Sequence, residues 1–143
     1  MTRWAGRPLE TVRATRLAVL LALGVVAVAA VVVWYRRPEP ATQPIRVPEL
    51  SAEALAGQDA FDIHCARCHG EHAAGTSTGP PLVDRIYHPA LHADIAVELA
   101  VRRGVPAHHW RFGDMPSQPV VPQTDVARIT RYVRELQKAN GIE

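Results

Sequence analysis

An uncharged, proline-free run of 19 residues, Leu17 to Tyr35, constrains this 143-residue chain more than any other feature. As an α-helix the run would be about 28 Å long, close to the ~30 Å hydrocarbon thickness of a bilayer. It is apolar on every face, and the rest of the chain is too short to surround it in a soluble core. Trp34 and Tyr35 stand at its end, where aromatic rings favour the membrane interface. We therefore expect residues 17–35 to span a membrane.

Arginines flank the apolar run on both sides, four before it and two directly after it. Because cytoplasmic flanks carry the excess of Lys and Arg, this distribution places residues 1–16 in the cytoplasm by a modest margin. The alternative is a cleaved signal peptide, since residues 27–29, Ala-Val-Ala, form an A-x-A-like cleavage site. The apolar residues continue past that site to Tyr35, which favours an uncleaved anchor.

The next segment, residues 36–50, contains four of the twelve prolines. It cannot form a regular helix and should favour the extended polyproline conformation. At ~3.1 Å per residue it would reach at most about 45 Å. We expect a semi-rigid tether that holds a domain of residues 51–143 away from the membrane.

The net charge of +2 belongs to the N-terminal part of the chain. Residues 1–50 contain seven Arg and three Glu, whereas residues 51–143 contain nine basic and eleven acidic residues. A domain that binds nucleic acid should have a basic surface, so nucleic acid is not an expected partner.

Three helices are expected in the domain, at residues 51–64, 92–103 and 125–139, with Gly- and Pro-rich loops between them. Ser51 and Thr124 are the expected N-caps of the first and third helix. No stretch alternates convincingly as a strand, which predicts an all-α domain. Three or four helices make a small core for this length, so a further group should fill the centre.

Residues 65–69, Cys-Ala-Arg-Cys-His, form the C-x-x-C-H attachment signature of c-type haem. Two thiols one helical turn apart can each bond a vinyl group of the macrocycle. The adjacent imidazole of His69 then reaches the iron from the same face. One covalently attached haem c, bound through Cys65, Cys68 and His69, would also fill the centre of the domain.

Two other interpretations of the cysteine pair are weaker. A thioredoxin-like redox pair expects a βαβ context, which the sequence lacks. A zinc site would combine the cysteines with two of His64, His69 and His72, but structural zinc usually takes its second ligand pair from a distant element. Here every candidate lies within nine residues.

With this motif, residues 50–142 resemble a monohaem class I cytochrome c of the membrane-anchored bacterial type. Gly57 and Phe61 resemble the glycine–aromatic pair of that family's first helix, and Tyr132 resembles the aromatic partner on its C-terminal helix. The resemblance implies an all-α class I cytochrome c fold, with three to four helices and loops around one covalent haem, after the transmembrane helix. It also implies that the first and last helices cross at Gly57.

The resemblance extends to the loop after the motif. Residues 79–82, Gly-Pro-Pro-Leu, resemble the family's Gly-Pro-x-Leu loop. This implies that the Pro80 carbonyl accepts a hydrogen bond from His69 Nδ1, and that Leu82 packs on the haem ring.

Residues 113–116, Gly-Asp-Met-Pro, resemble the family's methionine ligand loop. Met115 is the only Met of the domain, 46 residues beyond His69, and its thioether suits the iron's sixth position. The alternatives are that Met115 fills a gap in the core, or that His108 or His109 takes the position.

Trp110 and Arg111 are candidates to hydrogen-bond the haem propionates, with Trp110 as a core aromatic residue as the alternative. The other histidines are expected on the surface.

The expected function is a membrane-tethered cytochrome that carries single electrons between respiratory redox partners and is not itself an enzyme. It would be a single-pass protein of a bacterial cytoplasmic membrane, with its C-terminal domain on the periplasmic side. One alternative is the haem-bearing subunit of a larger membrane oxidase or dehydrogenase complex. Another is a small haem peroxidase or sensor, which would need an open sixth position on the iron.

Overall fold

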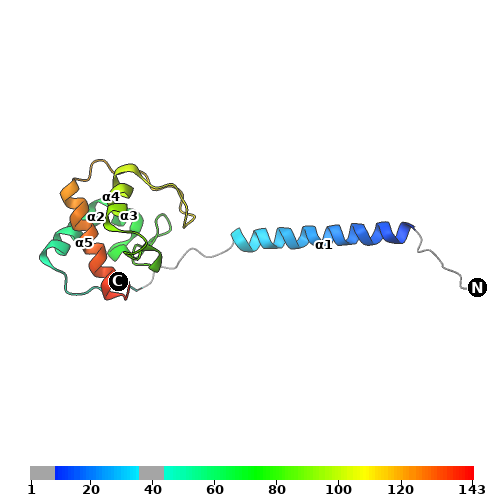
Figure 1. Cartoon of the computed structure of the whole chain (residues 1–143), viewed down its shortest axis with the longest axis horizontal. Helices are drawn as coiled ribbons and strands as arrows, with labels where there is room; N and C mark the ends of the chain where they lie inside the picture. Colours follow the sequence, from blue (N-terminus) through cyan, green and yellow to red (C-terminus); the bar gives the residue numbers. More distant parts are fainter. Residues whose placement is uncertain (1–8, 36–43) are drawn as a thin grey trace, which may run out of the picture. The chain divides into compact units, whose positions relative to one another are not determined.

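The computed structural model describes residues 9–35 and 44–143. The remaining residues lie outside the described part, and with them most of the expected tether and the flanking Arg36 and Arg37. The chain divides into two units, Met1–Pro38 and Glu39–Glu143, which Figure 1 shows in blue tones and in cyan to red.

The described part of the N-terminal unit is the helix α1 (Leu9–Tyr35). Its stretch Arg13–Val33 is long and apolar enough to cross a membrane, and none of that stretch is buried inside the protein. A helix that exposes leucine and valine side chains on all sides needs apolar surroundings. The helix therefore fits the predicted membrane anchor, although a signal sequence has the same composition.

The second unit is built from helices and short turns. The helices are α2 (Ala52–His64), α3 (Ala66–His69), α4 (Asp94–Arg103) and α5 (Gln123–Ala139), with 3₁₀ turns η1 (Glu71–Ala73) and η2 (Arg85–Tyr87). No strand occurs among residues 44–143; one isolated bridge pairs Val105 with Met115. The predicted all-α fold is confirmed for the described part of the chain.

The N-cap of α2 also attaches this helix to α5. The Ser51 hydroxyl accepts a hydrogen bond from the Ala54 N–H at 3.2 Å, as expected of an N-cap. The same hydroxyl donates to Glu135 Oε1 at 2.8 Å, and the Ser51 N–H donates to Glu135 Oε2 at 3.0 Å. The start of α2 is therefore fixed both to its own first turn and to α5.

The centre of the domain is the crossing of α2 and α5, which lie side by side in Figure 1. A Cβ at Gly57 would overlap the carbonyl group of Arg128, so only glycine allows this approach. One turn later, Phe61 and Tyr132 meet edge to face with ring centroids 5.5 Å apart, and both are fully buried. The predicted crossing at Gly57 and the predicted aromatic contact are confirmed.

Two predicted helix starts were wrong by two residues. Helix α4 begins at Asp94 rather than His92, after Ala93, whose side chain cannot cap. Helix α5 begins at Gln123, because the Pro122 carbonyl accepts the N–H groups of residues 125 and 126, each at 3.0 Å. Thr124 therefore lies inside the first turn and is not the N-cap.

The described end of the expected tether, residues 44–50, packs on the domain. Ile45 and Leu50 contact the apolar core. The Asn140 side chain bonds both backbone groups of Arg46, with Oδ1 accepting from its N–H at 3.0 Å and Nδ2 donating to its carbonyl at 2.9 Å. These residues extend the domain towards the N-terminus beyond Ser51.

Candidate functional site

The C-x-x-C-H motif begins at Cys65, in the turn that follows α2, and its other four residues form the single-turn helix α3. The Cys65 N–H still donates to the Phe61 carbonyl of α2 at 2.7 Å, and the Cys65 carbonyl accepts the His69 N–H at 2.9 Å. This turn places Cys65, Cys68 and His69 on the wall of one cavity. The sequence motif is therefore also a spatial cluster, with both thiols and the imidazole on the same side.

His69 has the orientation that a metal ligand requires. Its Nδ1–H donates to the Pro80 carbonyl at 2.9 Å, which leaves the Nε2 lone pair available. Burial lowers the pKa of His69 even though the bond to Pro80 opposes that shift. The imidazole is therefore neutral near pH 7, the form that binds a metal.

The loop that contains Pro80 packs closely against the C-x-x-C-H motif. A Cβ at Gly79 would come within 2.5 Å of the Cys68 carbonyl oxygen, so glycine permits the close approach. The Thr76 hydroxyl donates to that same carbonyl at 2.6 Å. Leu82, at the end of the loop, packs against the core and lines the larger of two cavities. The local sequence thus fixes the Pro80 carbonyl relative to His69.

Two cavities meet at the motif, with volumes of about 410 Å³ and about 100 Å³. Cys65, His69, Pro80 and Met115 line both. Most of the other residues that line the larger cavity are apolar. They include Leu82, Val97, Leu99, Val101, Val105, Ile129 and Val133. The larger volume lies in the range of cofactor pockets.

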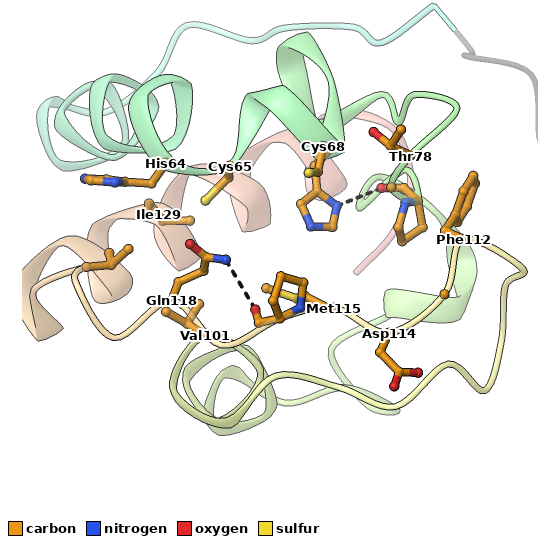
Figure 2. A pocket seen from close by; sticks show the side chains of 16 residues that line it. His64, Cys65, Cys68, Thr78, Val101, Phe112, Asp114, Met115, Gln118 and Ile129 are labelled. Atoms are coloured by element: carbon orange, nitrogen blue, oxygen red, sulfur yellow. Dashed lines mark hydrogen bonds between the residues drawn. The ribbon is translucent and has the colours of Figure 1, made fainter.

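Met115 is positioned by its backbone. It pairs with Val105 through two hydrogen bonds of 2.9 Å, in which each N–H donates to the other residue's carbonyl. Gly104, at φ +73°, ends α4 and lets the chain turn back at this point. The Asp114 carboxylate closes the loop by accepting the Ala107 N–H at 2.8 Å. Figure 2 shows Met115 across the pocket from Cys65 and Cys68.

The surroundings of Cys65 do not favour its thiolate form. Burial, and secondarily the neighbouring Cys68, raise the pKa of Cys65 to about 11. Redox-active cysteine pairs instead have a lowered thiol pKa. Within the described residues, the cysteines also do not converge with His64 or His72 into a group that could hold a metal ion. Both thiols line the cavity, a placement that fits covalent attachment of a group bound there.

The donor set and the cavity fit a haem. Two thiols lie beside a neutral imidazole whose Nδ1 is already bonded, and a thioether lines the same apolar cavity from the opposite side. Apolar walls suit a macrocycle, and the two candidate axial donors are of the types found in electron-transfer cytochromes.

The two predicted propionate residues lie in different environments. Trp110 lines the larger cavity, but its indole N–H donates to the Tyr87 hydroxyl at 3.0 Å. Arg111 is exposed and lines neither cavity. Tyr87, whose pKa is raised by burial, is a cavity residue that no sequence motif marks.

The other six histidines are distributed around the domain. His64 lines the smaller cavity, His72 Nδ1 lies 3.2 Å from the Tyr132 hydroxyl, and His88 Nδ1 accepts the Ala90 N–H at 3.1 Å. The other three, His92, His108 and His109, line the larger cavity together. The sequence analysis considered His108 and His109 only as alternative iron ligands and missed their convergence with His92, which lies 16 positions before His108.

Residues 52–133 match the family model described as cytochrome c oxidase, cbb3-type, subunit III. The match covers more than half of the chain and includes both cysteines, Pro80 and Met115. No curated protein and no solved structure shows significant similarity to the chain.

Proposed function

Because the chain belongs to the family described as cytochrome c oxidase, cbb3-type, subunit III, we propose that it is a single-haem electron carrier tethered to a membrane. Membership of this family identifies the domain as a c-type cytochrome and the chain as a haem-bearing electron-transfer protein. Our proposal adds the residues that hold the haem, the position of the domain and the partners.

The observation that carries this proposal is the relation between His69, Pro80 and Met115. His69 Nδ1 is engaged 2.9 Å from the Pro80 carbonyl, and Met115 lines the same cavity from the opposite side. A neutral imidazole and a thioether on two sides of an apolar cavity provide both axial positions of an iron. A peroxidase or gas sensor needs one of these positions open.

Each residue of the site has a role in this proposal. Cys65 and Cys68 would hold the macrocycle through thioether bonds, and His69 and Met115 would bind the iron. The Pro80 carbonyl keeps His69 in the Nδ1–H tautomer and raises the basicity of its Nε2. Leu82 and other apolar residues exclude water. The bound haem supplies a reversible one-electron couple.

We assign residues 1–16 to the cytoplasm, 17–35 to the membrane, 36–43 to a connecting segment and 44–143 to a cytochrome domain on the periplasmic side of a bacterial cytoplasmic membrane. The support is the apolar stretch Arg13–Val33 and the covalent haem that the family implies. Protease added to intact spheroplasts should remove the haem-bearing domain and leave the anchor. N-terminal sequencing should find an uncleaved chain.

The family description favours one class of partner, a membrane-bound terminal oxidase. The chain would then deliver electrons to the oxidase, either as a stable subunit or as a separate carrier. Co-purification of an oxidase with the detergent-solubilised chain would distinguish the subunit from the carrier.

The deciding experiment combines mass and spectroscopy on the full chain. Intact-mass analysis should show one haem added, and Cys65→Ala combined with Cys68→Ala should abolish the addition. The wild type should titrate as one reversible one-electron couple, remain low-spin in both oxidation states and fail to bind carbon monoxide. A high-spin protein that binds carbon monoxide readily would refute the carrier function and favour catalysis or sensing.

A further inference from the structure

Three histidines that the haem does not require converge at the larger cavity. His92 precedes α4, whereas His108 and His109 lie in the loop that leads to Met115. One ring nitrogen of each lies within 4.8 Å of the other two, and this is the one such group of potential ligands among the described residues. The ring centroids of His108 and His109 are 4.1 Å apart, and those of His92 and His109 are 5.5 Å apart.

The hydrogen bonds of these rings match those of metal-ligating histidines. His108 Nδ1–H donates to the Pro106 carbonyl at 2.8 Å, which leaves its Nε2 free to bind a metal. His92 Nδ1 is the one buried side-chain polar atom of the described residues without a hydrogen-bond partner. Buried polar atoms are normally satisfied, so this nitrogen indicates a missing partner.

The backbone around His92 is fixed, so its ring is presented from a rigid support. The Arg134 guanidinium of α5 bonds the His92 carbonyl and donates to the Tyr87 carbonyl at 3.0 Å. Arg134 also pairs with Asp94, the first residue of α4, at 2.8 Å. Because His92 is held in place, only the more exposed loop that carries His108 and His109 needs to move for the three rings to bind one ion.

We propose that His92, His108 and His109 form a binding site for a divalent transition-metal ion, with Zn²⁺ as its representative. Three imidazoles with no carboxylate in the group select against Ca²⁺ and Mg²⁺, which prefer oxygen ligands. Three protein ligands with an open fourth position form the arrangement of accessible zinc sites. In a tetrahedral zinc site the nitrogens are about 3.3 Å apart, so the three rings need to close by at most about 1.5 Å.

The site is separate from the iron ligands but lies near the haem. His108 and His109 are exposed, so an ion can enter from solvent without passing through the cavity. His109 is six residues before Met115 in the same loop. A bound cation would therefore add positive charge near the proposed haem and restrain the loop that carries its proposed sixth ligand. The added charge should raise the reduction potential when the site is filled, because it favours the reduced iron.

The test uses the full-length, haem-loaded protein in a neutral detergent after treatment with a chelator. Zn²⁺ is added by equilibrium dialysis, and zinc is counted per haem for the wild type and for His92→Gln, His108→Gln and His109→Gln. The matched control is His88→Gln, because His88 is four residues before His92 and lies outside the group. The haem absorption spectrum of each variant before zinc addition reports folding and iron coordination.

We expect one Zn²⁺ per haem in the wild type and in His88→Gln, at least tenfold weaker binding in each of the three variants, and unchanged low-spin spectra. Cu²⁺ bound in place of Zn²⁺ should show hyperfine splitting from two or three imidazole nitrogens in its electron paramagnetic resonance spectrum. Equal zinc binding by the wild type and the three variants would overturn the proposal. So would a loss of the low-spin spectrum in one variant before zinc is added, because that histidine would then belong to the iron.

Discussion

The two proposed axial ligands are fixed in different ways at the level of single residues. His69 is held through its ring, because Nδ1–H bonds the Pro80 carbonyl and the side chain is buried. Met115 is held through its backbone by the paired hydrogen bonds with Val105, while its side chain has three rotatable bonds. His69 is therefore the more rigid ligand, and Met115 is the one that a substitution can replace without displacing the haem.

Replacing Met115 tests this difference. In Met115→Ala the iron should lose its sixth ligand, bind carbon monoxide and show a lower reduction potential, because a thioether stabilises the reduced iron. Met115→His should remain low-spin but also fall in potential. Redox titration and carbon monoxide binding of the full chain measure both effects. If Met115→Ala kept the wild-type potential and excluded carbon monoxide, the sixth ligand would be another residue.

The sequence could predict those site residues that belong to local motifs. Residues 79–82 follow residues 65–69 closely in sequence, and their resemblance to the family's loop correctly implied the contact that His69 makes with Pro80. Trp110 was predicted near the propionates, but its hydrogen bond to Tyr87 depends on two loops far apart in sequence. Spacing gives no signal for such a contact, since it depends on how the loops fold over the cavity.

At the scale of the elements, the close contact of α2 with α5 depends on the missing side chain of Gly57. Gly57→Val should force the helices apart and lower the free energy of unfolding by about 1–3 kcal/mol or more. The reason is that even a Cβ would overlap the Arg128 carbonyl, which is backbone and cannot rotate away. Chemical denaturation followed by haem absorbance measures the change. Asp59→Val, at an exposed position of the same helix, is the matched control and should cost much less.

A second contact between the same helices depends on pH. Although burial opposes the shift, hydrogen bonds from Ser51 and from Arg131 lower the pKa of Glu135 below its ordinary value. The folded state therefore binds a proton at Glu135 less readily than the unfolded state does. The contribution of this carboxylate to stability is complete above the ordinary carboxyl pKa and is lost as the pH falls through the lowered pKa.

Glu135→Gln should therefore lower the melting temperature near neutral pH, and the difference from the wild type should shrink in acid. The melting temperatures of the two proteins, followed across this pH range by haem absorbance, provide the measurement. Glu98→Gln is the control, because Glu98 pairs only with Arg102 on its own helix, at 3.2 Å, and should show a smaller difference at every pH. A difference between Glu135→Gln and the wild type that stayed constant with pH would contradict this assignment.

How well the sequence predicted the start of each helix depended on the residue that caps it. The start of α2 was correct because Ser51 is an N-cap with a side chain that can bond the first turn. The starts of α4 and α5 were displaced because Ala93 and Pro122 cap them with no side-chain hydrogen bond. The helical periodicity of apolar residues identifies the central turns of a helix. A helix start without a capping side chain has no such sequence signal.

At the scale of the whole molecule, the N-terminal and C-terminal parts of the sequence differ in charge. The basic excess belongs to residues 1–50, whereas residues 51–143 contain nine basic and eleven acidic residues. Within the domain, several of these charges pair along or between helices, as in Arg131 with Glu135 at 2.7 Å and Arg134 with Asp94 at 2.8 Å. The near balance and the local pairing leave no strong overall field to attract a partner of one sign.

Electron exchange with the domain should therefore depend only modestly on salt. We expect rates with an anionic reductant, such as ascorbate, and with the hexaammineruthenium(II) cation to change in opposite directions as salt rises. Each change should stay within about tenfold, since charges more than about 10 Å apart are screened at ~0.1 M salt. Stopped-flow reduction of the ferric full chain in neutral detergent measures both rates, and an uncharged reductant is the control. A fall of several orders of magnitude with either charged reagent would show a strong single-sign patch beside the haem edge, and docking would then be governed by steering.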